Sequence, residues 1–286
     1  MTFEVLSLSS LTGAQRAEIE ALQKSVYDAE GLQNTAWLSN EINFDRSVPC
    51  FFLGYADGAL VSFLTLFLPT RQEGEVTAFT ALEQRGKGYF TALLQTAANV
   101  LAEHHVPNFL FALEPKSETG MAYLRAHFPQ AVHSHTEYRM FREPDVQPLP
   151  EGITARPVTK ENLEDFMAVS VKEYGGDRMA VEAVLTSELR RAYLIYDRER
   201  PVGVFELADG EALTLCGVAV AEEERGKGYG KAIVRAALNF AAETGKRIEL
   251  DVDSENPPAL HLYRKFGFQP TFEVQYWRAG IRSQMQ

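Results

Sequence analysis

One hexapeptide occurs twice in this chain, almost unchanged. Residues 84–89 read Gln-Arg-Gly-Lys-Gly-Tyr, and residues 224–229, at an offset of 140, read Glu-Arg-Gly-Lys-Gly-Tyr. The same offset aligns the apolar stripes of the helices expected after each copy, and it aligns Tyr123 with Tyr263. An offset that holds across several elements is the signature of a repeated structural unit. The sequence therefore predicts two copies of one fold.

The length of 286 residues is enough for two ordinary hydrophobic cores. Pro144, Pro148 and Pro150 interrupt the chain between strand-like segments, which is typical of a linker. We therefore expect an N-terminal domain over residues 1–143, a linker over 144–151 and a C-terminal domain over 152–286.

Each copy alternates strand-like and helix-like patterns in the same order. Strands are expected at 3–8, 50–55, 59–67, 75–81, 109–113 and 132–141, and again at 153–157, 191–197, 202–207, 213–220, 247–253 and 271–278. Helices are expected at 12–27 and 163–174 and after each glycine-rich loop, while 28–43 fits either a second helix or a loop over a substrate. The pattern predicts an α/β (α+β) fold, in which each domain has a mixed, mostly antiparallel sheet flanked by helices.

The second glycine-rich loop has the features of a phosphate-binding site. An apolar strand leads into Gly226, Gly228 and Gly230, and a helix follows. The first-turn amides of a helix lack intrahelical partners, and glycines let a phosphate approach the backbone. A P-loop is excluded because Arg225 stands where its first glycine is needed and Ala232 replaces the magnesium-binding hydroxyl. The glycine spacing also does not fit a dinucleotide fingerprint.

What does fit is Arg-x-x-Gly-x-Gly, which resembles the acetyl-CoA pyrophosphate signature of the GNAT superfamily of N-acetyltransferases. Residues 256–268, Asn-Pro-Pro-Ala-Leu-His-Leu-Tyr-Arg-Lys-Phe-Gly-Phe, resemble the second signature of that family. Together, the two repeats extend the resemblance over nearly the whole chain.

The resemblance implies that acetyl-CoA is the cosubstrate and that Tyr263 is the general acid for the leaving thiolate. The residues it implies for acetyl-CoA binding are Val218, Ala219, Val220, Arg225, Gly226, Lys227, Gly228, Tyr229, Gly230, Lys231 and Asn256 and, on weaker grounds, Arg85, Gly86, Lys87, Gly88, Tyr89 and Phe90. No metal site is expected, because His133 and His135 have no recognisable third ligand nearby.

The general base is left open. Some relatives carry a glutamate in the strand before the loop, but the matching residue here is Thr214. The acidic residues near it in sequence are Glu206, Glu211, Asp251 and Asp253. A lysine-like amine must lose a proton at a cost of roughly 4–5 kcal/mol at neutral pH, so the need for a base depends on the acceptor.

The first copy departs from the signatures. Phe90 replaces Gly230, Lys116 replaces Asn256 and His127 replaces Gly267. These changes favour a non-catalytic first copy over a second active site, and both interpretations stay open.

Composition and net charge restrict the classes of partner that we expect for this chain. The net charge of −11 argues against nucleic-acid binding, and no apolar run reaches the ~18 residues of a membrane span. Cys50 and Cys216 fit buried thiols of a cytoplasmic protein. We expect acetyl transfer by direct attack, in a ternary complex, to a primary amine of a small molecule or peptide, with the acceptor site shaped by segments such as 28–43 and 172–190. The alternative is a non-catalytic acyl-CoA-binding sensor or scaffold, and nothing in the sequence specifies an oligomeric state.

Overall fold

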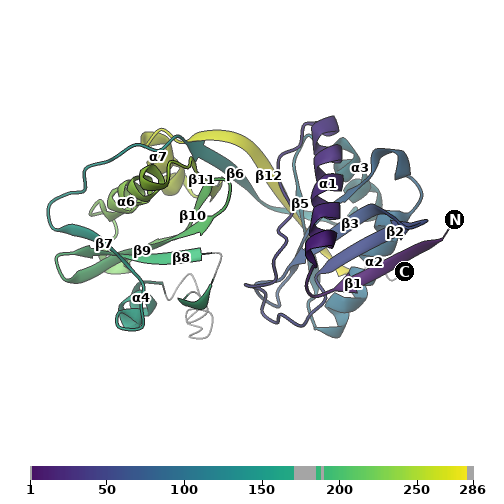
Figure 1. Cartoon of the computed structure of the whole chain (residues 1–286), viewed down its shortest axis with the longest axis horizontal. Coiled ribbons are helices and arrows are strands. Elements are labelled where there is room, and N and C mark those ends of the chain that lie inside the picture. Colours follow the sequence, from purple (N-terminus) through teal and green to yellow (C-terminus); the bar gives the residue numbers. More distant parts are fainter. Residues whose placement is uncertain (1, 171–184, 188–189, 282–286) are drawn as a thin grey trace. The chain divides into compact units, whose positions relative to one another are not determined.

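The computed structural model describes residues 2–170, 185–187 and 190–281. The chain divides into two compact units (Figure 1). Unit 1 is Met1–Glu137 with Phe272–Gln286, and unit 2 is Tyr138–Thr271. Among the described residues, no helix is long and apolar enough to cross a membrane.

Unit 1 is a mixed sheet with helices packed on it, as predicted. Its elements are β1 (Phe3–Leu8), α1 (Gly13–Glu30), β2 (Phe51–Ala56), β3 (Ala59–Phe67), β4 (Gly74–Thr80), the 3₁₀ turn η1 (Leu82–Gln84), α2 (Tyr89–Glu103), β5 (Asn108–Leu113), α3 (Glu118–His127), and parts of β6 (Val132–Arg142) and β12 (Gln269–Gly280). The strand order is β1-β2-β3-β4-β5-β12-β6. Strands β1 to β4 are antiparallel, β5 runs parallel to β4, and β12 runs antiparallel to β5.

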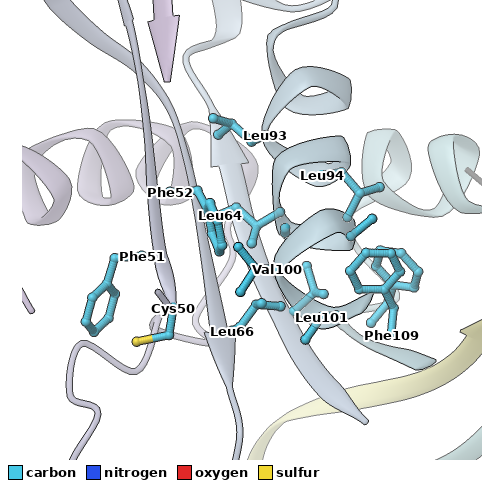
Figure 2. Close-up of a cluster of buried hydrophobic side chains, with 14 of the residues drawn as sticks. Cys50, Phe51, Phe52, Leu64, Leu66, Leu93, Leu94, Val100, Leu101 and Phe109 are labelled. Carbon is cyan, nitrogen blue, oxygen red and sulfur yellow. The ribbon is translucent and has the colours of Figure 1, made fainter. Parts of the chain in front are cut away.

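The apolar stripe predicted after the first glycine loop forms the centre of this unit. Leu93, Leu94 and Leu101 of α2 are fully buried, and Figure 2 shows them with Phe52 of β2 and Leu64 of β3. Burying one such side chain contributes roughly 1.5–3 kcal/mol, so this layer fixes α2 against the sheet. The glycine loop in front of α2 is held in place by the same packing.

The ambiguous segment 28–43 is not a second helix. Helix α1 starts at a capping box between Thr12 and Gln15 and ends at Gly31, whose φ of 67° is left-handed. Residues 31–50 then contain only turns and irregular chain. The hairpin predicted at Asp57-Gly58 is confirmed, since both residues have positive φ (49° and 84°), as a two-residue type I′ turn requires.

Unit 2 repeats the plan. Its elements are β7 (Ile153–Pro157), α4 (Leu163–Ser170), β8 (Arg190–Asp197), β9 (Arg200–Asp209), β10 (Leu213–Val220), the 3₁₀ turn η2 (Glu222–Glu224), α6 (Tyr229–Thr244), β11 (Ile248–Asp253) and α7 (Pro257–Lys265). Strands β7 to β10 are antiparallel and β11 is parallel to β10. The predicted helix 163–174 is present to Ser170, and its last four residues, like most of 172–190, lie outside the described part of the chain.

The compact units differ from the predicted domains at the last strand. Residues 272–280 were expected in the C-terminal domain, but Gln275–Gly280 pair with Leu113–Asn108 of β5 and belong to unit 1. Residues 138–143 correspondingly belong to unit 2. Strand pairing between distant parts of a chain leaves no local sequence signal, so this exchange was not predicted.

The proline-rich segment expected as a linker packs on unit 2. The backbone N–H of Gln147 donates to the side chain of Asn239 on α6 at 2.6 Å, and the Asn239 amide donates back to the Gln147 carbonyl at 2.9 Å. These reciprocal bonds fix the middle of the segment against α6.

Candidate active site

The glycine loop of unit 2 leads from β10 through η2 into α6. Gly226 and Gly228 have φ values of 79° and 94°, which side-chain-bearing residues rarely adopt. Gly228 is the N-cap of α6 and supplies no side-chain bond to the first-turn amides. A Cβ built on either glycine would meet nothing within 4 Å, so the space in front of these amides is open. The loop has the geometry of an anion cradle.

Unit 1 contains the same loop backbone. Gly86 and Gly88 have φ values of 74° and 84°, and Gly88 is the N-cap of α2. In both copies the signature arginine donates from Nε to the carbonyl at the end of the preceding strand: Arg85 to Thr80 at 3.2 Å and Arg225 to Val220 at 3.3 Å. The arginine therefore holds the loop to its strand in each unit, a role that the motif alone did not reveal.

Next to each loop, two parallel strands part. In unit 2 the β10–β11 ladder consists of Leu213 with Ile248 and Thr214 with Glu249. In unit 1 the β4–β5 ladder ends at Val76 and Phe111. Beyond these points the backbone groups that face the gap need another partner, which a bound ligand can supply.

Strand β10 contains a bulge that β4 lacks. Between the pairs Cys216–Glu206 and Ala219–Val204, two residues, Gly217 and Val218, oppose the single residue Phe205 of β9. Gly217 takes up the kink with a φ of 57°. A bulge leaves backbone groups outside the regular ladder. The β3–β4 ladder of unit 1 is regular from Ser62–Thr80 to Phe67–Glu75.

Glu206 lies directly behind this bulge. The side chain is 1% exposed, and a Cβ built on Gly217 would lie 3.0 Å from its Oε1. Neither carboxylate oxygen accepts a hydrogen bond from any residue the structure describes, although Nη1 of Arg190 lies 3.5 Å from Oε2. Burial raises the pKa of Glu206 from 4.5 to about 7. A carboxyl group with such a pKa can exchange a proton near neutral pH.

The other acidic candidates are differently placed. Asp251 accepts two hydrogen bonds from Arg139 at 2.5 and 2.8 Å. Asp253 accepts the backbone N–H of Glu255 at 2.8 Å, and Glu211 is exposed. Of the four, Glu206 combines burial with unbonded oxygens, and β-sheet register rather than sequence distance brings it to the bulge.

The second signature forms helix α7. Asn256 is its N-cap and accepts the Ala259 N–H at 3.2 Å, and Pro257 is the first helical residue. Gly267, with a φ of 82°, follows the helix. Tyr263 is 6% exposed and contacts Phe268 edge-on, with ring centroids 5.8 Å apart. Asn256 thus has a capping role, beside which its acetyl-CoA contact stays a prediction.

Residues 159–268 match the family model described as Acetyltransferase (GNAT) family. The C-terminal part of the chain, which forms most of unit 2, is therefore a GNAT acetyltransferase domain. This match confirms the expected class, an acetyl-CoA-dependent N-acetyltransferase, and accounts for the loop, the parted strands and α7 of unit 2 together.

Curated relatives match parts of the chain. An uncharacterized N-acetyltransferase of Methanocaldococcus jannaschii is 26% identical over 158 residues, 48% of this chain and 70% of the relative. A mycothiol acetyltransferase of Clavibacter sepedonicus is 28% identical over 145 residues, 46% of this chain and 48% of that protein. A streptothricin acetyltransferase of Streptomyces lavendulae is 42% identical, over 20% of this chain and 31% of its own length.

Two solved structures cover almost all of this chain. A tandem GNAT protein from the clavulanic acid biosynthesis pathway superposes with a TM-score of 0.72 at 17% identity, over 98% of this chain and 99% of that chain. A GCN5-related N-acetyltransferase from Sphaerobacter thermophilus gives 0.71 at 19% identity, over 98% and 96%. These matches confirm the predicted fold of two GNAT domains.

Charged side chains brace the loop of unit 2. Glu224 is 4% exposed, with Arg200 at 2.5 Å and Lys227 at 3.1 Å from its carboxylate. Tyr229 donates from its hydroxyl to Asp197 at 2.6 Å. Lys227 and Tyr229, both predicted to contact acetyl-CoA, therefore stabilise the loop itself.

The GNAT fold of unit 1 encloses a cavity of about 590 Å³ between the parted strands β4 and β5, the loop, α3 and the end of α1. Here Arg85 is held by Glu30 through two hydrogen bonds of 2.6 and 2.9 Å. Phe90 and Tyr123 contact edge-on at 4.7 Å. Glu114 accepts the backbone N–H groups of Gln33 and Asn34, which fixes the chain after α1 beside the cavity.

The raised pKa of Glu206 predicts that the difference in stability between a Glu206→Gln variant and the parent protein depends on pH. Its folded-state pKa lies above its unfolded value, so its contribution to stability is complete below pH 4.5 and is lost as pH rises through about 7. The glutamine of Glu206→Gln stays neutral at every pH. The free energy of unfolding of the variant, relative to that of the parent, should therefore increase by up to about 3 kcal/mol between pH 5 and pH 8. Calorimetric unfolding of both proteins across this range measures the gain.

Glu211→Gln, which changes an exposed acid of the same unit, is the matched control and should follow the parent at every pH. A Glu206→Gln variant whose difference from the parent did not vary with pH would contradict the raised pKa.

Proposed function

We propose that unit 2 transfers the acetyl group of acetyl-CoA to a primary amine of a small molecule or peptide, by direct attack in a ternary complex. The observation that carries this proposal is the β10 bulge with the buried Glu206 behind it, next to an open anion cradle in the same unit. The combination offers a place for the thioester, a group to accept a proton and a site for the pyrophosphate.

The loop residues Arg225–Lys231 suit the pyrophosphate, because the first-turn amides of α6 are not capped by a side chain. The bulge residue Val218, with its neighbours Ala219 and Val220, suits the pantetheine arm and the acyl carbonyl. A backbone N–H outside the ladder can donate to the carbonyl oxygen as negative charge develops there. We assign cosubstrate binding in unit 2 to these two segments.

The chemical step moves two protons. The amine nitrogen attacks the thioester carbon, the C–N bond forms and the C–S bond breaks. We assign the proton released by the amine to Glu206 and the proton taken up by the leaving thiolate to Tyr263. A carboxyl group titrating near neutral pH suits the first role, and a buried phenol on α7 suits the second.

Replacing Tyr263 by Phe should lower kcat by about 10²-fold, with little change in the KM for acetyl-CoA, because only the acid function is removed. Release of free CoA thiol, with an amine acceptor found by screening small amines and peptides, measures both constants. Tyr123→Phe removes the hydroxyl at the matching place in unit 1 and serves as the control. An unchanged kcat in Tyr263→Phe would rule out its role as the acid.

Replacing Glu206 by Gln should lower kcat by about 10²-fold at neutral pH. The parent rate should rise with pH through an apparent pKa of about 7, and this rise should be absent from the variant. A pH–rate profile with the same acceptor tests both points, with Glu211→Gln as the control. A variant that kept the parent profile would exclude Glu206 as the base.

Unit 1 fits the second candidate function, acyl-CoA binding without transfer. It keeps the loop and a cavity, but its β3–β4 ladder has no bulge and its Arg85 is neutralised by Glu30. We propose that unit 1 is the non-catalytic copy. The cytoplasmic location expected from the sequence stays a prediction.

A further inference from the structure

A groove with four cationic side chains lies beside α6 in unit 2. It encloses about 580 Å³ and is lined by Arg142, Gln147, Lys231, Arg235, Lys265, Phe266 and Gly267. These residues come from the end of β6, the segment packed on α6, the first turns of α6 and the end of α7. Such a concentration of positive charge stands out in a chain with a net charge of −11.

Three of the four cations are not neutralised by acidic groups. Within the described part of the chain, Lys231, Arg235 and Lys265 form no ion pair, and the buried Nε of Arg235 has no hydrogen-bond partner. A buried donor without an acceptor is costly, so this N–H is matched to an acceptor supplied from outside. The chemistry of the groove is that of an anion site.

The fourth cation, Arg142, has bonding partners within unit 2 and supports the groove through them. Arg142 donates to the carbonyl of Phe266 and pairs with Asp145 at 2.5 Å. The carbonyls at the end of α7 would otherwise present partial negative charge to an anion. Arg142 offsets that charge where the groove passes α7.

The position of the groove identifies its anion. Lys231 directly follows Gly230, the last glycine of the cradle, and Arg235 lies one turn further along α6, about 6 Å by helix geometry. In CoA the 5′-pyrophosphate and the 3′-phosphate are attached to the same ribose. The groove adjoins the cradle at Lys231, so an anion in the groove would be a neighbour of a pyrophosphate in the cradle.

We propose that this groove binds the 3′-phosphate of the CoA moiety, so that unit 2 discriminates CoA from its 3′-dephospho form. The assignment rests on the proposed function of unit 2. A phosphomonoester carries about 1.5–2 negative charges at neutral pH and three strong acceptor oxygens, which match several separate cations.

The first copy provides an internal comparison. At the offset of 140, Lys231 and Arg235 correspond to Thr91 and Gln95. Thr91 shares a hydrogen bond with Tyr123 at 3.1 Å, and Gln95 donates to Asn99 at 3.4 Å. Unit 1 thus has neutral, internally bonded residues in place of two of the cations, and the discrimination belongs to unit 2 alone.

The test is calorimetric titration of the full chain with acetyl-CoA and with acetyl-3′-dephospho-CoA, in a Gly88→Glu background that restricts binding to unit 2. Acetyl-CoA should bind at least about 10-fold more tightly, as expected for charge-assisted hydrogen bonds to a phosphate. Arg235→Gln and Lys265→Gln should each remove most of this ratio and leave the affinity for the dephospho form within about twofold. Arg264 precedes Lys265 on α7 but does not line the groove, so the control variant Arg264→Gln should keep the ratio.

Equal affinities of the parent for the two forms would overturn the assignment and leave the acetyltransferase proposal intact. Absence of binding by either form would instead overturn the proposed function. A third titration uses inorganic phosphate. If phosphate bound the parent and not the Arg235→Gln variant, while the two CoA forms bound equally, the groove would be a site for free phosphate and the CoA assignment would be wrong.

Discussion

In both units, two parallel strands stop sharing hydrogen bonds partway along the strand that leads to a glycine loop. In unit 2 the parting begins after Thr214 and Glu249, and the β10 bulge lies within it. The other parts of the candidate site depend on this interruption, because it leaves backbone groups facing a gap instead of a neighbouring strand. The cradle lies at one end of the gap and Glu206 lies behind the bulge.

The two copies share the backbone geometry of the glycine loop and differ in the side chains around it. Both loops use left-handed glycines and the same arginine-to-carbonyl bond. In unit 1 the signature arginine pairs with Glu30, and α2 has neutral residues where α6 has Lys231 and Arg235. Both copies thus keep the cradle backbone. Among the residues that the structure describes, the cradle of unit 2 is flanked by cations without an ion pair, whereas unit 1 has neutral, internally bonded side chains at the matching positions.

Local features were predictable because local physics produces them. The glycine loop, the Asn256 cap, the Asp57-Gly58 turn and the apolar stripe of α2 each follow from backbone preference or periodicity over a few residues. Glu206 could only be named among four acids, since its position depends on the register between β9 and β10 and on a one-residue bulge. The pairing of β12 with β5 joins residues more than 160 positions apart and left no local trace.

The central claim is that unit 2 holds acetyl-CoA at its glycine loop. Calorimetric titration of acetyl-CoA into the full chain, into Gly228→Glu and into Gly88→Glu tests it most directly. A carboxylate at either glycine would enter open space in front of the first-turn amides and repel a phosphate, at a similar conformational cost in both copies. The account predicts a binding site that Gly228→Glu abolishes and Gly88→Glu leaves in place. A folded parent that did not bind acetyl-CoA, or a Gly228→Glu variant that kept all of the binding, would contradict it.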